Sequence, residues 1–405
     1  MHYYGSNILL IETILLSHQY NYIMAGTIAP SESANRNLFA ADLFSVIVDK
    51  KTNENIVYSP ASIQTCLALA YTGAEGETAE EMRKVLKLGV GNKTQVAEKY
   101  GEFLKTAFTH SKSEEKGPQL KMANRVYVNN QLKLLPQFNK IAQDYFQSQA
   151  ENVDFTQSEA VAKQINNWVA QQTENKIQDL LTPDAVNGDT SAVLVNAIYF
   201  KGKWLNPFSE ITTSKADFHL NSKQKLEVDT MYTDDRFGYV ELPELKATAL
   251  EMPYENSELS MLIILPNEIE GLEKLEENLK GLDLNDITSK MSVESVDVFL
   301  PKFRIEFDID LKEPLKKMGM SSIFSSSANF SALFDTSTPQ KISDVKHKAF
   351  LDVNEAGSEA AAATYLKIVP MSLNLDQKTF RADHPFVFAI RSKTAVYFAG
   401  HVAKF

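Results

Sequence analysis

The sequence feature that most constrains the fold of this chain is an alanine-rich stretch, Glu355–Thr364, about forty residues before the end. It follows an extended-looking run, Ile342–Val353, and leads into Ile368–Ser372. One set of alternate residues is small or apolar and carries no charge: Ser358, Ala360, Ala362, Thr364, Leu366 and Ile368. The other set is mixed and carries the charges: Glu359, Ala361, Ala363, Tyr365 and Lys367. This period of two is typical of a half-buried β-strand.

The same stretch has no fixed local preference. Four consecutive alanines, Ala360–Ala363, suit a helix or an exposed loop as well as a strand. The segment can therefore be a loop in one state and a strand in another. Taken alone, it also fits a plain alanine-rich linker.

The composition indicates one globular unit. Of the 405 residues, 44% are hydrophobic and 23% are charged, which provides enough apolar surface for a large core. No linker-like composition or internal repeat divides the chain. We expect a single domain over residues 28–405, with residues 1–27 as an N-terminal extension or weak signal segment. The net charge of −11 is spread over interspersed acidic and basic residues, which argues against a nucleic-acid partner.

The N-terminus and the one cysteine do not decide whether the protein is secreted or cytoplasmic. The run Ile8–Leu16 could be the apolar part of a signal peptide, but Glu12 interrupts it and no Lys or Arg precedes it. We expect secretion, with a cytoplasmic protein as the alternative if translation starts at Met24. Cys66 has no partner for an intramolecular disulfide, so stability must come from packing. No run reaches the ~18 apolar residues of a membrane-spanning helix, and we expect no membrane partner.

Hydrophobic periodicity predicts helices and strands without strict alternation, which favours an α+β fold. Ser59 is expected to cap a helix that starts at Pro60, and Thr78 with Glu81 indicates a capping box. The expected helices are Ser33–Lys51, Pro60–Tyr71, Ala79–Leu88, Gln95–His110, Gln137–Phe146, Ala160–Gln172, Leu272–Leu282 and Phe307–Met318. The expected strands are Leu120–Val128, Ala192–Phe200, Leu226–Met231, Thr248–Met252, Leu259–Leu265, Val296–Phe303, Ile342–Val353, Phe386–Ile390 and Val396–Val402.

Several separated motifs resemble those of the serpin family. They are Asn55–Ile63, Val195–Trp204 with Pro207-Phe208, Leu300–Phe303, Asp383–Ile390 and Phe398–Gly400. The second and third are highly specific, and the fourth is similar to the C-terminal signature of the family. The matches follow the family order from about residue 38 to residue 405, so the resemblance covers nearly the whole chain.

The resemblance implies a definite fold and mechanism. A serpin is a single α+β domain with three β-sheets, about nine helices and an exposed reactive-centre loop, here about residues 355–380. The target protease cleaves this loop and forms an acyl-enzyme. The cut loop then enters the large sheet as a new strand, and the tethered protease is distorted. The implied partner is therefore a serine protease held in a covalent complex by a monomeric inhibitor without a cofactor.

The resemblance places the hinge of the loop in the alanine-rich stretch. Gly357 permits a sharp change of the backbone. The inward positions carry no charge, proline or bulky group, and in the family this favours inhibition. The assigned hinge residues are Glu355, Gly357, Ser358, Glu359, Ala360, Ala361, Ala362, Ala363 and Thr364.

Counted by the family spacing, the bond to be cut is Met371–Ser372. Met371 is unbranched and apolar, so it fits the deep hydrophobic pocket of an elastase-, chymotrypsin- or subtilisin-like protease. Its surroundings resemble the bait of an antitrypsin-type inhibitor, and Leu373 is an alternative cut residue. An ordinary exposed methionine remains the simpler interpretation. The recognition residues around the bond are Ile368, Val369, Pro370 and Leu373.

A polar cluster beneath the large sheet is the second site that the resemblance implies. Its members are Ser59, Ser62, Asn196 and His347, and Trp204 with Glu355 matches the place where insertion starts. Buried polar groups need partners, so such a cluster can act as a latch between two strands. The simpler interpretation is a capping serine, a satisfied structural histidine and a core tryptophan.

Two sequons, at Asn92 and Asn329, are candidate glycosylation sites if the protein is secreted. An enzyme is the first competing function, but the chain has no Gly-x-Ser-x-Gly elbow, His-Glu-x-x-His motif, phosphate loop or cysteine-based metal site. We therefore expect neither catalysis nor a metal. The second alternative is a non-inhibitory serpin that carries, stores or chaperones another molecule.

Overall fold

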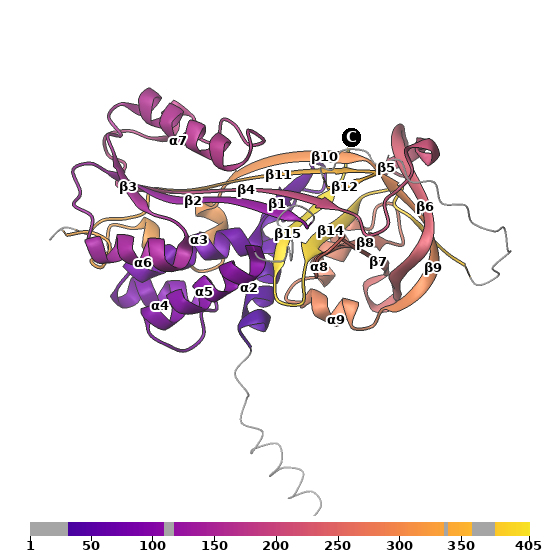
Figure 1. Ribbon diagram of the computed structural model, residues 1–405, viewed down its shortest axis with the longest axis horizontal. Helices are drawn as coiled ribbons and strands as arrows, with labels where there is room; N and C mark the ends of the chain where they lie inside the picture. Colours follow the sequence, from indigo (N-terminus) through magenta and orange to yellow (C-terminus); the bar gives the residue numbers. More distant parts are fainter. Residues whose placement is uncertain (1–30, 109–116, 336–338, 359–376) are drawn as a thin grey trace, which may run out of the picture.

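Two β-sheets and a group of helices make up the molecule (Figure 1). The computed structural model describes residues 31–108, 117–335, 339–358 and 377–405. Nine α-helices lie in these ranges, in agreement with the expected number. They are α2 (Glu32–Ile47), α3 (Pro60–Gly73), α4 (Gly76–Val85), α5 (Lys93–Phe108), α6 (Pro136–Phe146), α7 (Ser158–Gln172), α8 (Leu272–Asn278), α9 (Leu284–Thr288) and α10 (Lys312–Lys317).

The six-stranded sheet is called the large sheet below because its long strands run along the molecule (Figure 1). Its strands lie in the order β10 (Phe303–Asp310), β11 (Asp344–Asn354), β12 (Gly357–Ser358), β4 (Ala192–Lys203), β2 (Gln119–Asn129) and β3 (Ala150–Val153). The nine-stranded sheet has the order β1 (Ile56–Tyr58), β15 (Val396–Val402), β14 (Phe386–Arg391), β8 (Ser260–Pro266), β7 (Ala247–Pro253), β6 (Gln224–Leu242), β9 (Ser292–Pro301) and β13 (Lys378–Arg381), with β5 (Ser214–Asn221) on β6.

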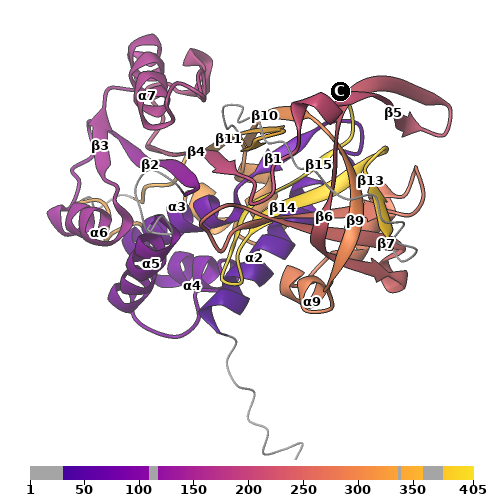
Figure 2. The same ribbon diagram turned by 45° about the vertical axis from the view of Figure 1, so that its right-hand side comes forward.

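The third expected sheet is the outer part of the nine-stranded one. Strand β6 is 19 residues long, and its successive segments pair with β5, then β9, then β7. Figure 2 shows β9 between β6 and β13, with β5 projecting from the body. The small outer group β5, β9 and β13 is thus continuous with the buried group β7, β8, β14, β15 and β1 through the shared strand. The α+β architecture is confirmed.

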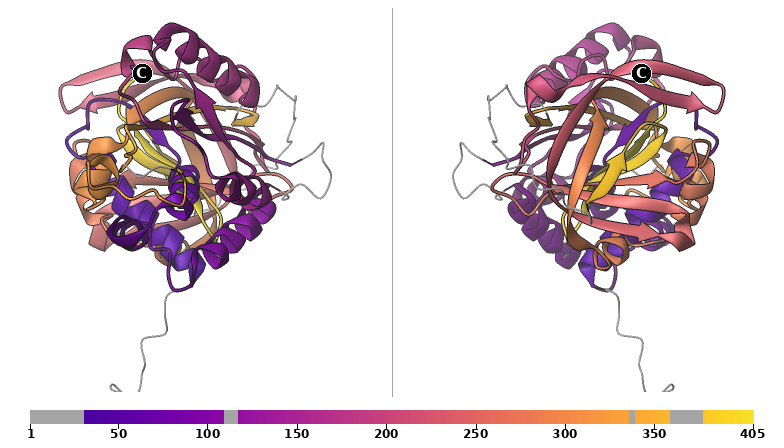
Figure 3. Two further views of the ribbon diagram at one scale, coloured as in Figure 1. Left: turned by 90° about the vertical axis from the view of Figure 1, so that its left-hand side faces the viewer. Right: turned by 90° about the vertical axis from the view of Figure 1, so that its right-hand side faces the viewer.

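Strand β4 is buried on both faces, which explains its continuous apolar sequence. Alternate residues point to opposite sides: Val193 and Val195 join the cluster beneath α7, whereas Leu194 and Ile198 join the main core on the side of α3. Figure 3 shows α7 over one face of the sheet and the other helices beneath the opposite face.

Helix α3 starts as the sequence predicts. Pro60 occupies its first turn, and the Ser59 hydroxyl accepts a hydrogen bond from the Ser62 backbone N–H at 3.2 Å. Every residue of the helix is buried. Cys66 lies within it, and burial raises the pKa of its thiol to about 12, so the group behaves as a small apolar side chain.

Two local predictions are wrong. Thr78 and Glu81 form no capping box, because α4 already begins at Gly76 without a side-chain cap. Their oxygens instead accept the backbone N–H groups of Asn329 at 3.0 Å and Ser322 at 2.7 Å. The predicted helix over Phe307–Met318 is a strand up to Asp310 and a short helix, α10, beyond it. Pairing of β10 with β11 outweighs the helical period there.

Candidate functional site

The large sheet has a joint between β11 and β4 that is closed at one end and open at the other. The two strands pair directly in parallel over seven residues, from Asp344 opposite Val193 to Phe350 opposite Tyr199. Beyond this ladder they separate, and β12 lies between them, with Ser358 opposite both Val353 of β11 and Gly202 of β4. The alanine-rich stretch therefore begins inside the sheet.

Gly357 lies at a position that only glycine fits. Its φ is +145°, which side chains rarely allow, and a Cβ there would lie 2.0 Å from the carbonyl oxygen of Gly202. The backbone of β12 thus approaches β4 more closely than any other residue type permits. Ser358 follows with 0% exposure.

Two aromatic side chains hold the start of β12. The indole N–H of Trp204 donates to the Asn354 carbonyl at 3.0 Å, and its backbone N–H donates to the Ala356 carbonyl at 3.0 Å. Its ring stacks on Tyr254 with centroids 4.6 Å apart. The Tyr254 hydroxyl bonds the Ser358 hydroxyl at 2.8 Å. Burial raises the pKa of Tyr254, so the phenol stays neutral and able to donate.

Glu355 anchors the turn between β11 and β12. Its carboxylate pairs with Lys302 at 2.9 Å and accepts from the Thr213 hydroxyl at 2.8 Å, while its carbonyl accepts from the Phe208 backbone N–H at 2.9 Å. Burial alone would raise the pKa of Glu355, but the hydrogen bonds from Lys302 and Thr213 outweigh it and lower the pKa. The turn is therefore fixed by a charged side chain.

The four predicted latch residues lie together at the middle of the joint. The Ser59 backbone N–H donates to His347 Nε2 at 3.1 Å, so Nε2 is the acceptor and Nδ1 donates to Asn196 Oδ1. The Asn196 amide donates to the Ser62 hydroxyl at 2.5 Å and to Asn124 Oδ1. Burial lowers the pKa of His347 to about 3, which keeps the imidazole neutral.

This polar cluster joins three strands to the start of α3. His347 and Asn196 are register partners across the β11–β4 joint, and Asn124 is the partner of Asn196 on β2. Sequence reasoning missed Asn124, although a lone amide inside the predicted strand Leu120–Val128 was a signal. It also missed Tyr254, for which no local signal exists.

A family model described as Serpin (serine protease inhibitor) matches residues 34–405. The chain belongs to the serpin family. It is 39% identical to Serine protease inhibitor 42Dd of Drosophila melanogaster over 89% of this chain and 94% of the relative. It is 38% identical to the leukocyte elastase inhibitor of Bos taurus over 92% of this chain and 98% of that one.

Solved serpin structures share the fold. The crystal structure of Serpin48 from the insect Tenebrio molitor is 38% identical, has a TM-score of 0.82 and is covered over 100% of its chain and 94% of this one. Human thyroxine-binding globulin, solved as a complex, is 27% identical with a TM-score of 0.81, covering 92% of this chain and 98% of that one.

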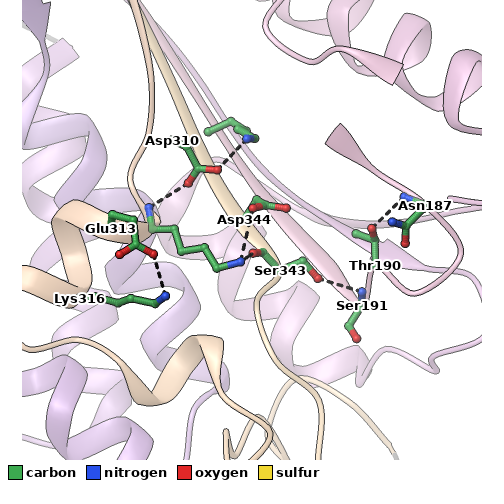
Figure 4. A network of polar contacts seen from close by, with 10 residues as sticks. Asn187, Thr190, Ser191, Asp310, Glu313, Lys316, Ser343 and Asp344 are labelled. Atoms are coloured by element: carbon green, nitrogen blue, oxygen red, sulfur yellow. Dashed lines mark hydrogen bonds and ion pairs between the residues drawn. The ribbon is translucent and has the colours of Figure 1, made fainter. Parts of the chain in front are cut away.

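A second polar cluster, which the sequence did not indicate, lies where the β11–β4 ladder begins, at Ser343 and Ser191–Ala192 (Figure 4). We call this end of the joint its foot. The Ser343 backbone N–H donates to the Ala192 carbonyl at 2.8 Å, and the Ser191 backbone N–H donates to the Ser343 hydroxyl at 3.1 Å. The Lys312 ammonium donates to the Ser343 carbonyl at 2.9 Å and lies 3.8 Å from Asp344. Burial, together with the nearby Asp310 carboxylate, raises the pKa of Asp344.

The remaining predicted site residues are distributed as follows. Asn92 and Asn329 are exposed, and the Asn92 side chain accepts from the Gln95 backbone N–H at the start of α5. The hinge residues Glu359–Thr364, the reactive bond Met371–Ser372 and the recognition residues Ile368, Val369, Pro370 and Leu373 lie outside the described residues.

Among residues 31–108, 117–335, 339–358 and 377–405, no group of His, Cys, Asp and Glu side chains could hold a metal ion. No helix in that part of the serpin is long and apolar enough to cross a membrane.

Proposed function

We propose that this serpin is an irreversible, suicide-substrate inhibitor of serine proteases, cleaved at Met371–Ser372. The observation that carries the proposal is β12, two residues of the bait-bearing segment that already lie between β11 and β4. After cleavage the segment beyond Ser358 continues into the same joint as a new strand. The acylated protease, attached at Met371, travels with it.

The register of β12 determines where each further residue would lie. Each step along the segment after Ser358 is one step back along both β11 and β4, because β12 is antiparallel to both. Residue 367 therefore reaches Asp344 on one side and Val193 on the other. Those two residues are partners in the present ladder, so the two registers agree. Insertion needs no slip of β11 past β4.

The same register brings Thr364 to the latch. Counted from Ser358, it would lie between His347 and Asn196. Its side chain would face the same side as Ser358, whose hydroxyl is buried against Tyr254, and as His347. The threonine hydroxyl can replace one of the hydrogen bonds that separation of His347 from Asn196 breaks. Ala360 and Ala362 fit the same face with little volume.

Insertion replaces one ladder by two, which supplies the driving force. Fourteen residues, from Ser358 to Met371, span ~45 Å as a strand. At ~1 kcal/mol net per backbone hydrogen bond, the added ladder contributes on the order of 10 kcal/mol. This is comparable with the stability of an ordinary domain. Distortion of the oxyanion hole of the protease then stops deacylation.

Met371 directs the inhibitor to proteases with a deep apolar pocket, of the elastase, chymotrypsin or subtilisin type. A trypsin-like protease needs Lys or Arg at the cut, and Lys367 is four residues too early. Relatives named as a leukocyte elastase inhibitor and as antichymotrypsin-2 support this class. Oxidation of Met371 would make the side chain polar and weaken recognition.

A carrier function is the alternative, because thyroxine-binding globulin shares the fold. The glycine at position 357 and the buried Ser358 favour inhibition, since both allow the segment to continue into the sheet. We further propose that the inhibitor is a secreted monomer glycosylated at Asn92 and Asn329, both of which are exposed. N-terminal sequencing and glycosidase treatment of the natural protein test this part.

The test of inhibition is a denaturing gel after incubation with pancreatic elastase or chymotrypsin. A band of higher mass that survives boiling supports the proposal, whereas only a clipped band at every ratio overturns it. Met371→Arg serves as the control for the cut site. It should lose the elastase complex and gain a trypsin complex; undiminished elastase inhibition would show that the bond lies elsewhere.

A further inference from the structure

We propose that Ser343 closes the foot of the large sheet as a second latch, which the inserting segment opens only with the residues that follow Thr364, 365–371. The inference rests on the proposed function, because it concerns the same insertion. It makes Ser343 a positioning residue for the completion of insertion rather than for its start.

The bonds at the foot cross the joint, as those of the central latch do. The Ser343 backbone N–H reaches Ala192 at 2.8 Å, and the Ser191 backbone N–H reaches the Ser343 hydroxyl at 3.1 Å. One serine thus satisfies two backbone groups of the opposite strand. The hydroxyl bond adds a link that the regular ladder, which starts at Asp344, does not contain.

Each half of this latch is held to its own side of the joint. On the β11 side, Lys312 donates from its ammonium to the Ser343 carbonyl at 2.9 Å and from its backbone N–H to Asp310 at 2.9 Å. On the β4 side, the Asn129 backbone N–H of β2 donates to the Ser191 carbonyl at 2.9 Å. When the joint opens, the bonds of Ser343 to Ser191 and Ala192 are therefore the ones that break.

The register separates the two latches in sequence. Residue 364 reaches His347 and Asn196, whereas residue 368 is the first to reach Ser343 and Ala192. The joint passes from the width that holds Ser358, at Val353 and Gly202, to direct pairing at Phe350 and Tyr199 within three residues. A segment that ends at residue 364 therefore leaves Asp344 and the foot paired. A segment that ends at residue 371 must release Ser343. The two latches therefore act on different lengths of the same strand.

Two synthetic peptides with the chain's own sequence test this difference. One covers residues 359–364 and the other residues 359–371, because the chain's own Ser358 already lies in the joint. An equimolar mixture is incubated with the intact protein, and the ratio of long to short peptide bound is measured by native mass spectrometry. Ser343→Ala should raise this ratio ~5-fold, which corresponds to one hydrogen bond across the joint.

The controls separate the foot from other effects. Ser343→Thr retains a hydroxyl and should restore the ratio of the unmodified protein, and Ser343→Gly should repeat the result of Ser343→Ala. Ser45→Ala removes a half-buried hydroxyl whose bond to the Asp42 carbonyl is local, and should leave the ratio unchanged. Asn196→Ala should favour both peptides equally. An unchanged ratio in Ser343→Ala and Ser343→Gly overturns the inference. Failure of both peptides to bind overturns insertion itself, and with it the proposed function.

Discussion

The two sheets hold neighbouring strands together in opposite ways. In the nine-stranded sheet β14 and β15 pair antiparallel, and every residue of both strands is buried. In the large sheet β11 and β4 pair in parallel, and a polar cluster occupies the middle of their joint. Apolar contacts between strands have no substitute once they separate, whereas polar partners can be exchanged for others. On the proposed function, β11 and β4 are the pair of strands that separates.

The largest expected effect is that of a charge at the open end of the joint. Ser358 is fully buried against Tyr254, so the guanidinium of Ser358→Arg would have to lose its water without a partner, at a cost of several kcal/mol. Titration against chymotrypsin should show a protein that is cleaved as a substrate, with a stoichiometry raised at least ~tenfold. Ser358→Ala should remain an inhibitor. Equal stoichiometries for the three proteins would contradict the assignment of the hinge.

The nine-stranded sheet should respond differently. Phe388 of β14 has 0% exposure, and Phe388→Ala should lower the free energy of unfolding by ~3–5 kcal/mol. The loss should be the same in the intact protein and in protein nicked in the loop, because β14 and β15 do not part. Denaturant unfolding of both forms measures it. Val293→Ala, at an exposed site, should change stability by less than ~0.5 kcal/mol.

A substitution in the central latch should change the stability of the intact and the nicked protein by different amounts, again measured by denaturant unfolding. Asn196→Ala leaves His347 Nδ1–H and Asn124 without their partner, which should destabilise the intact form by ~2 kcal/mol. In the nicked form the inserted strand separates His347 from Asn196, so the loss should be smaller. Identical losses in the two forms would mean that the joint stays closed.

Acid should weaken the joint by way of His347. Burial lowers the pKa of this histidine from 6.5 to about 3, so between these values the unfolded chain binds a proton that the folded one does not. Stability from this group is complete above pH 6.5 and falls by roughly 1.4 kcal/mol per pH unit as the pH decreases towards 3. Urea unfolding at pH 7, 6 and 5 should show a steeper loss for the unmodified protein than for His347→Gln. Parallel pH profiles would remove the histidine from this role.

Sequence alone predicted those parts of the fold that depend on local chemistry. The start of α3 at Ser59 and Pro60 follows from capping, and β4 follows from its length and apolar character. The capping box at Thr78 failed because α4 already begins at Gly76, and the Thr78 hydroxyl instead accepts from the Asn329 backbone N–H. Helical and strand periods overlap in β10, and only pairing with β11 decides between them.

The candidate site was predictable only where family motifs named its residues. Ser59, Ser62, Asn196 and His347 were assigned by resemblance, and their contacts join parts of the chain up to 288 residues apart. Asn124, Tyr254 and Ser343 also make contacts with residues distant in sequence, but no family motif includes them. Their roles follow from the register of strands distant in sequence, which no local pattern contains.

The buried thiol of Cys66 can report whether α3 separates from the rest of the fold. Cys66 lies one helical turn beyond Ser62, inside a helix with no exposed residue, and the high pKa of its sulfhydryl leaves almost no thiolate at neutral pH. A maleimide can reach it only when α3 comes away from its neighbours. The rate of labelling therefore measures how often the fold opens as a whole. Strand insertion confined to the large sheet would leave this rate unchanged.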